Sequence, residues 1–376
     1  MTPGPTVGVE EEFLLVDHGG QLAPCGPEIA DGPDPADGEL QYELARCQVE
    51  LASGVCADAG EAFDQLVELR ARLARSAAAL DARLMPSATP VLDEEFQPEV
   101  TAIPRYHRMV EHFGAIARTA NTCGCHVHVE IPDRSAGVRV INHLRPWLPL
   151  LLALTANSPY HFGVDTGYAS WRHVMLARWP SAGAPPWFAS LDEYEAGVDT
   201  LLRAGALLDK GMVYWDVRLS EQHPTVEIRV SDVAATPYEA ALLAAIVRAM
   251  VAVGLETPPS SDVQPAPVLR ANLWRAARDG LGGSCLHPVT GRLEPVLDQV
   301  RGLVDDLRPV LRRHGDLDLT DDALARLSSG GDGATRQRAA FDRHGRLLDV
   351  VDLLAGDPPT ATASAALPAA GGSSNR

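Results

Sequence analysis

The chain has 376 residues, of which 46% are hydrophobic and 22% charged, a composition typical of a globular protein with a large core. Its 50 acidic side chains outnumber the 32 basic ones, which gives a formal net charge of −18. A surface this acidic repels nucleic-acid backbones and anionic membranes, so we expect neither as a partner. Nucleotides remain compatible with this charge, because metal ions can neutralise their phosphates.

The N-terminal sequence MTPGPTVGVEEEF has no basic or apolar segment, which argues against a signal peptide. The longest apolar stretch, residues 240–255, contains Arg248 and is too short to span a bilayer comfortably. We therefore expect a cytoplasmic protein whose six cysteines are free thiols. Lys210 is the only lysine, and no P-loop surrounds it.

Hydrophobic periodicity divides the chain into short strands and longer helices. Residues 18–39 are rich in Gly, Pro and Asp and are expected to be irregular, and residues 158–190 are expected to form a long ordered loop. Strands are expected at residues 6–15, 48–56, 84–90, 125–131, 213–220 and 225–231, and helices at 60–83, 104–121, 138–157, 191–208 and 237–255 and over most of 267–355.

The order of these elements shows no regular alternation of strand and helix, which favours an α+β fold with a largely antiparallel sheet. No internal repeat or linker divides residues 1–355, so we expect a single catalytic domain. Residues 356–376 are of low complexity and are expected to be disordered.

Three acidic residues lie in the first predicted strand. Side chains alternate along a strand, so Glu10 and Glu12 share one face while Glu11 lies on the other with the apolar residues. Neighbouring carboxylates repel, so we expect a positive group between Glu10 and Glu12. Taken alone, the pattern also fits a solvated edge strand.

The sequence TCGCHVHVE places two imidazoles on one strand face. His126, His128 and Glu130 point one way, and the intervening valines point to the core. Cysteine and histidine are also zinc ligands, but Cys125 points away from both histidines and no second pair follows at ligand spacing. We therefore expect no structural zinc, and we expect Cys123 and Cys125 to be dispensable for chemistry.

A predicted hairpin carries charges on both strands. Asp216 and Arg218 share a face of the first strand, and Glu227 and Arg229 share a face of the second. Cross-strand ion pairing, for example between Arg229 and Asp216, would explain any single pair.

Together these strands predict one polar sheet face in which carboxylates outnumber cations. Such oxygen ligands with an imidazole suit Mg²⁺ or Mn²⁺, and two or three such ions can support phosphoryl transfer without a P-loop. A metal-dependent hydrolase using the same face to activate water is an alternative. The residues of this face are Glu10, Glu12, Glu50, His126, His128, Glu227 and Arg229.

Several motifs resemble, in order, the carboxylate-amine ligase family, also called glutamate–cysteine ligase type 2, of the glutamine synthetase superfamily. They include GVEEEF, ELARCQVEL, TCGCHVHVE, VYWDVRLSEQHPTVEIRVSD and NLWRAARDGL, and the match extends from Thr6 to GATRQRAA at residues 333–340. The resemblance implies a funnel-shaped antiparallel sheet of about six strands backed by helices. It also implies that ATP phosphorylates a substrate carboxylate and that an amine then attacks the acyl phosphate.

The resemblance further assigns site residues. His128 is implied to contact ATP phosphates. Three arginines are implied to contact phosphates or a substrate carboxylate, namely Arg172, Arg178 and Arg218. Arg229, beside Glu227, is implied to stabilise the transferring phosphoryl group. Spacing alone would have assigned two of the implied metal ligands, Glu43 and Glu50, to the surface. The implied metal ligands are Glu10, Glu12, Glu43, Glu50, His126 and Glu227.

We therefore predict a carboxylate–amine ligase that uses ATP and Mg²⁺ or Mn²⁺, with glutamate as the default acid. A ligase for another amino acid and amine in a specialised biosynthesis is the main alternative. The partners expected are small-molecule amino acids and amines, and a homo-oligomer is left open. Glu130 stands where the family pattern suggests a small residue, which places an extra carboxylate at or near the site.

Overall fold

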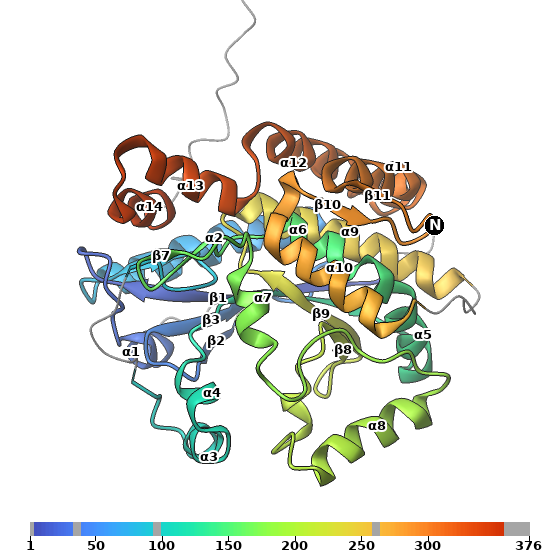
Figure 1. Cartoon of the computed structure of the whole chain (residues 1–376), viewed down its shortest axis with the longest axis horizontal. Coiled ribbons are helices and arrows are strands. Elements are labelled where there is room, and N and C mark those ends of the chain that lie inside the picture. Colours follow the sequence, from blue (N-terminus) through green and yellow to red (C-terminus); the bar gives the residue numbers. More distant parts are fainter. Residues whose placement is uncertain (1–3, 33–38, 93–98, 258–263, 357–376) are drawn as a thin grey trace, which may run out of the picture.

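The computed structural model describes residues 4–32, 39–92, 99–257 and 264–356. Its centre is a seven-stranded antiparallel sheet with strand order β2-β3-β1-β5-β9-β8, and β4 pairs with β1 beside this path (Figure 1). The expected α+β class and antiparallel sheet are confirmed. The predicted tail lies almost wholly outside the described residues, so the division at residue 355 stays a prediction.

Six strands of the sheet overlap the predicted ones, and three of these, β3, β4 and β8, are shorter than predicted. No strand was predicted at β2, which begins at the end of the segment expected to be irregular, or at two short hairpins. The sheet consists of β1 Val7–Val16, β2 Glu39–Tyr42, β3 Gln48–Ala52, β4 Arg83–Met85, β5 Gly124–Glu130, β8 Val217–Leu219 and β9 Thr225–Asp232. The hairpins pair β6 Tyr160–His161 with β7 Val164–Asp165 and β10 Ser284–Leu286 with β11 Leu293–Pro295.

Helices cover one face of the sheet and continue into the C-terminal third (Figure 1). The first nine are α1 Gly26–Ala30, α2 Ala59–Ala78, α3 Pro104–Phe113, α4 Ala115–Arg118, α5 Arg134–Leu144, α6 Leu148–Leu154, α7 Trp171–Leu176, α8 Leu191–Arg203 and α9 Pro237–Glu256. The others are α10 Ala266–Asp279, α11 Val296–His314, α12 Leu317–Gly330, α13 Gly333–His344 and α14 Leu347–Leu354. Three short 3₁₀ helices are η1 Arg145–Trp147, η2 Lys210–Met212 and η3 Gly280–Gly282.

Glycine and proline divide two segments that were predicted as single helices. The segment 104–121 breaks between α3 and α4 at Gly114, whose φ of 58° is unfavourable for residues with a side chain. The segment 138–157 is interrupted by η1, which contains Pro146, because proline lacks the backbone N–H that the interior of an α-helix needs. The predicted long loop contains α7 and the β6–β7 pair.

Helix α9 is apolar on all sides because it is buried on all sides. It packs against β1, β5, α2, α5, α11 and α12. By length and composition it could cross a membrane, but 78% of its most apolar window is buried inside the protein, as in the core helix of a folded domain. Arg248 in this helix is neutralised by Asp316 at 2.6 Å.

The alternation of β1 separates the two faces of the sheet. Val9, Glu11 and Phe13 are buried on the side covered by helices, while Glu10 and Glu12 point to the other side. Glu11 forms a buried ion pair with Arg70 of α2, at 2.8 Å from Nε to Oε2. The sheet therefore presents a helix-covered apolar face and an opposite face that carries charges.

Candidate active site

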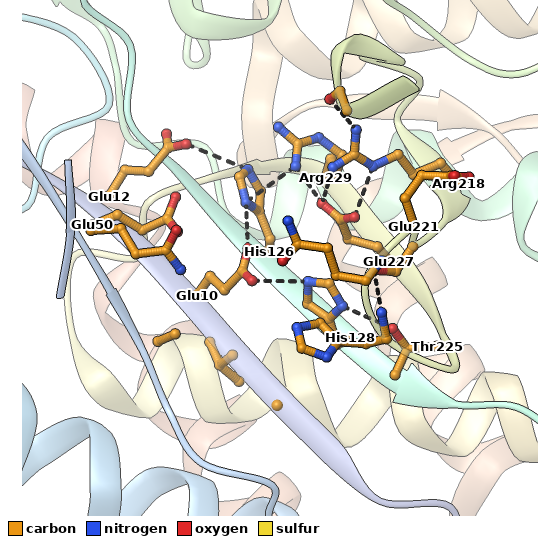
Figure 2. Close-up of a pocket in the computed structure, with 18 of the residues that line it drawn as sticks. Glu10, Glu12, Glu50, His126, His128, Arg218, Glu221, Thr225, Glu227 and Arg229 are labelled. Atoms are coloured by element: carbon orange, nitrogen blue, oxygen red, sulfur yellow. Dashed lines mark hydrogen bonds and ion pairs between the residues drawn. The ribbon is translucent and has the colours of Figure 1, made fainter. Parts of the chain in front are cut away.

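The charged face of the sheet lines a cavity of about 1250 Å³. Lining residues come from β1, β2, β3, β5, β8 and β9, from α3 and α7, and from the segments that precede β3 and β8 and that follow α7. Every second residue of a strand faces the cavity, which is why short motifs on separate strands converge there (Figure 2). Strand pairing adds to this convergence, since Glu12 lies opposite Glu50 and Glu10 opposite His126.

Seven acidic and imidazole side chains in the cavity form three overlapping groups. Within each group, one ligand atom from each residue lies within 4.8 Å of the others. Glu10 and Glu50 each belong to two groups, so the groups form one continuous cluster. The groups are Glu10, Glu50 and His126; Glu10, His128 and Glu227; and Glu12, Glu43 and Glu50.

The two histidines of β5 hold this cluster together. Nδ1 of His126 lies 3.3 Å from Glu10, and its Nε2 lies 3.8 Å from Glu12 and is buried without a hydrogen-bond partner. Nε2 of His128 lies 3.2 Å from Glu10, and its Nδ1 lies 2.9 Å from Thr225 Oγ1 (Figure 2). A buried imidazole nitrogen beside carboxylates fits a divalent cation.

The carboxylates nearest β3 are strongly perturbed. Burial and the neighbouring Glu12 raise the pKa of Glu43 to about 7. Burial and the carboxylates of Glu43 and Glu10 raise the pKa of Glu50 well above its usual range. Burial also raises the pKa of Glu10, but hydrogen bonds with His126 and His128 outweigh it and lower that pKa overall. A bound cation would favour the ionised form of all of these groups.

At the other end of the cluster, Glu227 lies between two arginines. Arg218 donates to both of its carboxylate oxygens, at 2.7 and 3.1 Å, and Arg229 donates to Oε1 (Figure 2). Burial raises the pKa of Glu227, and the two guanidinium groups outweigh burial and lower it. Nη1 of Arg229 also lies 3.5 Å from Nδ1 of His126, so the guanidinium adjoins the carboxylate–histidine cluster.

Of the remaining predicted residues, Arg172 lies in the cavity, Arg178 lies outside it and Glu130 lies at its rim. Arg172 lines the cavity, is only 3% exposed, and has a buried Nε without a hydrogen-bond partner. Arg178 is not among the lining residues, since its guanidinium bonds to Met175 O and to Thr119. Glu130 lies at the exposed rim, where its carboxylate accepts hydrogen bonds from the backbone and hydroxyl of Thr6.

Some cavity residues were not assigned a role from the sequence. Asp216 was noted only as sharing a strand face with Arg218 and as a candidate ion-pair partner of Arg229, yet it is buried and lines the cavity. Arg229 bonds to Glu227 through its side chain and to Asp216 only through its backbone N–H. Tyr106 and Trp179, in the predicted helix and loop, also line the cavity, and no local sequence pattern signals their position.

The sequence of the chain matches known proteins over nearly its whole length. The profile of the family described as glutamate-cysteine ligase family 2 (GCS2) matches residues 6–352. A Rhodococcus jostii protein named for glutamate–cysteine ligase 2 is 49% identical over 352 residues, which cover 93% of this chain and 95% of that protein. A Mycolicibacterium vanbaalenii protein of the same name is 49% identical over 361 residues, covering 94% and 97%.

Solved structures with low sequence identity share the fold. Glutamate–cysteine ligase from Francisella tularensis, in complex with AMP, has a TM-score of 0.70 at 15% identity, covering 94% of this chain and 88% of that one. The ligase PafA, in complex with the ubiquitin-like protein Pup, has a TM-score of 0.54 at 12% identity, covering 94% and 73%. The family profile and the relatives near 49% identity establish that this chain belongs to glutamate–cysteine ligase family 2 and is a carboxylate–amine ligase.

Proposed function

We propose that the protein uses ATP and Mg²⁺ or Mn²⁺ to join a substrate carboxylate to an amine through an acyl phosphate, with glutamate as the default acid. The observation that carries this proposal is the continuous cluster of carboxylates and imidazoles, closed at one end by the Glu227–Arg229 pair. The AMP bound to the Francisella ligase and the names of the close relatives support the nucleotide and the acid.

The described residues divide into cation ligands and groups that act on the substrates. Glu10, Glu12, Glu43, Glu50, His126 and Glu227 would hold the cations, which when bound neutralise phosphate oxygens.

Beside the cluster, Arg229 would stabilise charge on the transferring phosphoryl group, because its planar guanidinium matches those oxygens. His128 and Arg218 would contact the nucleotide phosphates. The buried, unpartnered Nε of Arg172 suits a substrate carboxylate or a phosphate.

The direct test is ADP release with a panel of amino acids as the acid, in the presence of Mg²⁺, with and without hydroxylamine as a trapping amine. We expect glutamate to give the highest rate and the trapped product to be the hydroxamate of its side-chain carboxylate. Preference for another acid would identify a ligase of a different biosynthesis. Hydroxamate formation without ATP would instead indicate a metal-dependent hydrolase and contradict the proposal.

A further inference from the structure

Asp216 is a cavity residue that the proposed function leaves without a role. It immediately precedes β8, its backbone N–H donates to Gly183 O at 2.9 Å, and its carbonyl accepts from the backbone N–H of Arg229 at 2.8 Å. The backbone is therefore fixed from both sides. The side chain lines the cavity and is only 6% exposed.

The carboxylate of Asp216 is buried without the partners that a structural carboxylate normally has. Its Oδ2 has no hydrogen bond, and within the described ranges no cationic nitrogen lies within 4.0 Å of its oxygens. The nearby cations are engaged elsewhere, since Arg229 pairs with Glu227 and the guanidinium of Arg172 donates to the carbonyls of Arg229 and Val230. A buried, unpaired carboxylate destabilises a fold, so its presence in a cavity favours a role in function.

Asp216 is also near the place of the proposed chemistry. The guanidinium of Arg172 packs over Gly124, where a Cβ atom would lie 2.2 Å from Nη2 of Arg172 and 3.0 Å from Nε2 of His126. Arg229 reaches His126 from the other side, at 3.5 Å. Both arginines act electrostatically on Asp216, where burial raises the carboxyl pKa to about 7 and the two guanidinium groups oppose it. Asp216 therefore lies beside the two arginines that adjoin the cluster.

We propose that Asp216 binds the amine substrate as its ammonium ion and accepts a proton from it, which makes Asp216 a catalytic residue of the second half-reaction. This inference rests on the proposed function, because it requires an acyl phosphate at the cluster. An ammonium ion has no lone pair, so it must lose a proton before it can attack. A carboxylate that faces the cavity without a partner supplies both the negative charge and the acceptor.

The ammonium nitrogen transfers one proton to Asp216, and its freed electron pair forms the C–N bond to the acyl carbon. The bond from that carbon to the phosphate oxygen breaks, and the leaving phosphate takes the second proton from nitrogen. The products are the amide, hydrogen phosphate and a protonated Asp216, which returns its proton to solvent.

The test compares two acceptors in Asp216→Asn, with L-glutamate, ATP and Mg²⁺ held constant. L-cysteine is mainly an ammonium ion at neutral pH and needs the acceptor, whereas hydroxylamine is mainly unprotonated and does not. We expect kcat/KM for L-cysteine to fall about 10²–10⁴-fold while hydroxamate formation and the KM for glutamate stay unchanged. The melting temperature should not fall, because the substitution removes an unpartnered buried charge.

Asp332→Asn serves as a control for removing a buried charge outside the cavity. An asparagine keeps the acceptor for the Thr335 N–H that caps α13 but loses the acceptor for the Leu281 N–H, so the melting temperature of this variant should fall. The variant should change neither rate. An equal loss with both acceptors, or a raised KM for glutamate, would assign Asp216 to the acid substrate and overturn the proposal, as would unchanged rates with both. If the wild-type protein forms no ADP with either acceptor, the proposed function itself fails.

Discussion

The carboxylate of Glu227 is held between the guanidinium groups of Arg218 and Arg229, and the two arginines differ in their other contacts. Arg218 also donates to the carbonyls of Gly211 and Val213, so it connects β9 to the segment that precedes β8. Arg229 instead reaches past Glu227 to His126. Arg218 therefore has structural contacts besides the role proposed for it at the nucleotide phosphates, whereas Arg229 extends toward the carboxylate–histidine cluster.

Arg229→Lys should keep the fold and nucleotide binding but lower kcat by about 10²–10³-fold, because an ammonium group cannot reproduce the planar donor fork at the phosphoryl group. Steady-state kinetics beside a thermal melt will separate this effect from a structural one. Arg338→Lys, in an exposed bidentate pair with Asp165 outside the cavity, is the control and should leave kcat unchanged. A lower melting temperature with near-normal kcat would make Arg229 a structural residue.

Glu11 provides a contrasting prediction on the other face of β1. Glu11→Gln leaves the guanidinium of Arg70 buried without its counter-charge and should lower the free energy of unfolding by about 3–5 kcal/mol. Urea denaturation measures this loss. The KM values of the protein that remains folded should not change, because Glu11 faces the helices. A loss below about 1 kcal/mol would mean that the pair behaves like a surface ion pair.

At the scale of elements, strand β5 carries cavity residues on one side and core residues on the other. His126 and His128 face the cavity, while Cys125, Val127 and Val129 are fully buried on the helix side. Burial raises the pKa of the Cys125 thiol well above its usual range, which makes a thiolate ligand unfavourable. The alternation of one strand thus separates the proposed cation ligands from a neighbouring thiol.

Replacing Cys123 and Cys125 together by alanine should keep kcat within about tenfold, or 1.4 kcal/mol. Alanine is preferable to serine, because both thiols are fully buried and, among the described residues, only Cys123, whose Sγ accepts from Nε2 of Gln48 at 3.4 Å, has a polar partner that a hydroxyl could use. The melting temperature should fall, since the smaller side chains leave cavities in the core. Stoichiometric zinc in the wild-type protein, lost with activity in the double variant, would contradict this interpretation.

At the scale of the whole molecule, the cluster joins β1, β3, β5 and β9, so its charge affects the stability of the entire sheet. Glu12, Glu43 and Glu50 lie within one ligand group, and mutual repulsion contributes to the raised pKa values of the last two. A divalent cation bound between these carboxylates would attract each of them and so offset their mutual repulsion. It should therefore stabilise the folded protein as well as enable its chemistry.

Adding Mg²⁺ or Mn²⁺ at about 100 times its dissociation constant should stabilise the fold by about 2.7 kcal/mol and raise the melting temperature. NaCl at matched ionic strength is the control, because screening alone should reproduce little of a site-specific effect. ADP formation should stop in excess EDTA and return with Mg²⁺. Robust turnover in EDTA would refute the assignment of the cluster to cations.

The sequence by itself determined which side chains share a strand face. The two-residue period of a strand places Glu10 with Glu12, and Glu227 with Arg229, whatever the rest of the chain does. The period also separated Cys125 from His126, and the buried cysteine agrees with it. The fold class and the family could be predicted for a related reason. The order of the motifs, and the alternation of side chains along each strand, are properties of the chain alone.

Only the tertiary structure decided which of these faces meet and which charges find partners. Glu43 reaches the cluster because β2, which ends at Tyr42, pairs with β3, with Gln41 opposite Glu50, and no strand was predicted at β2. The partner of Glu11 comes from α2, and the missing partner of Asp216 is visible only when every neighbour is placed. Strand periodicity is local, whereas pairing and burial depend on residues distant in sequence, so the sequence revealed the chemistry of each strand and the fold assembled the site.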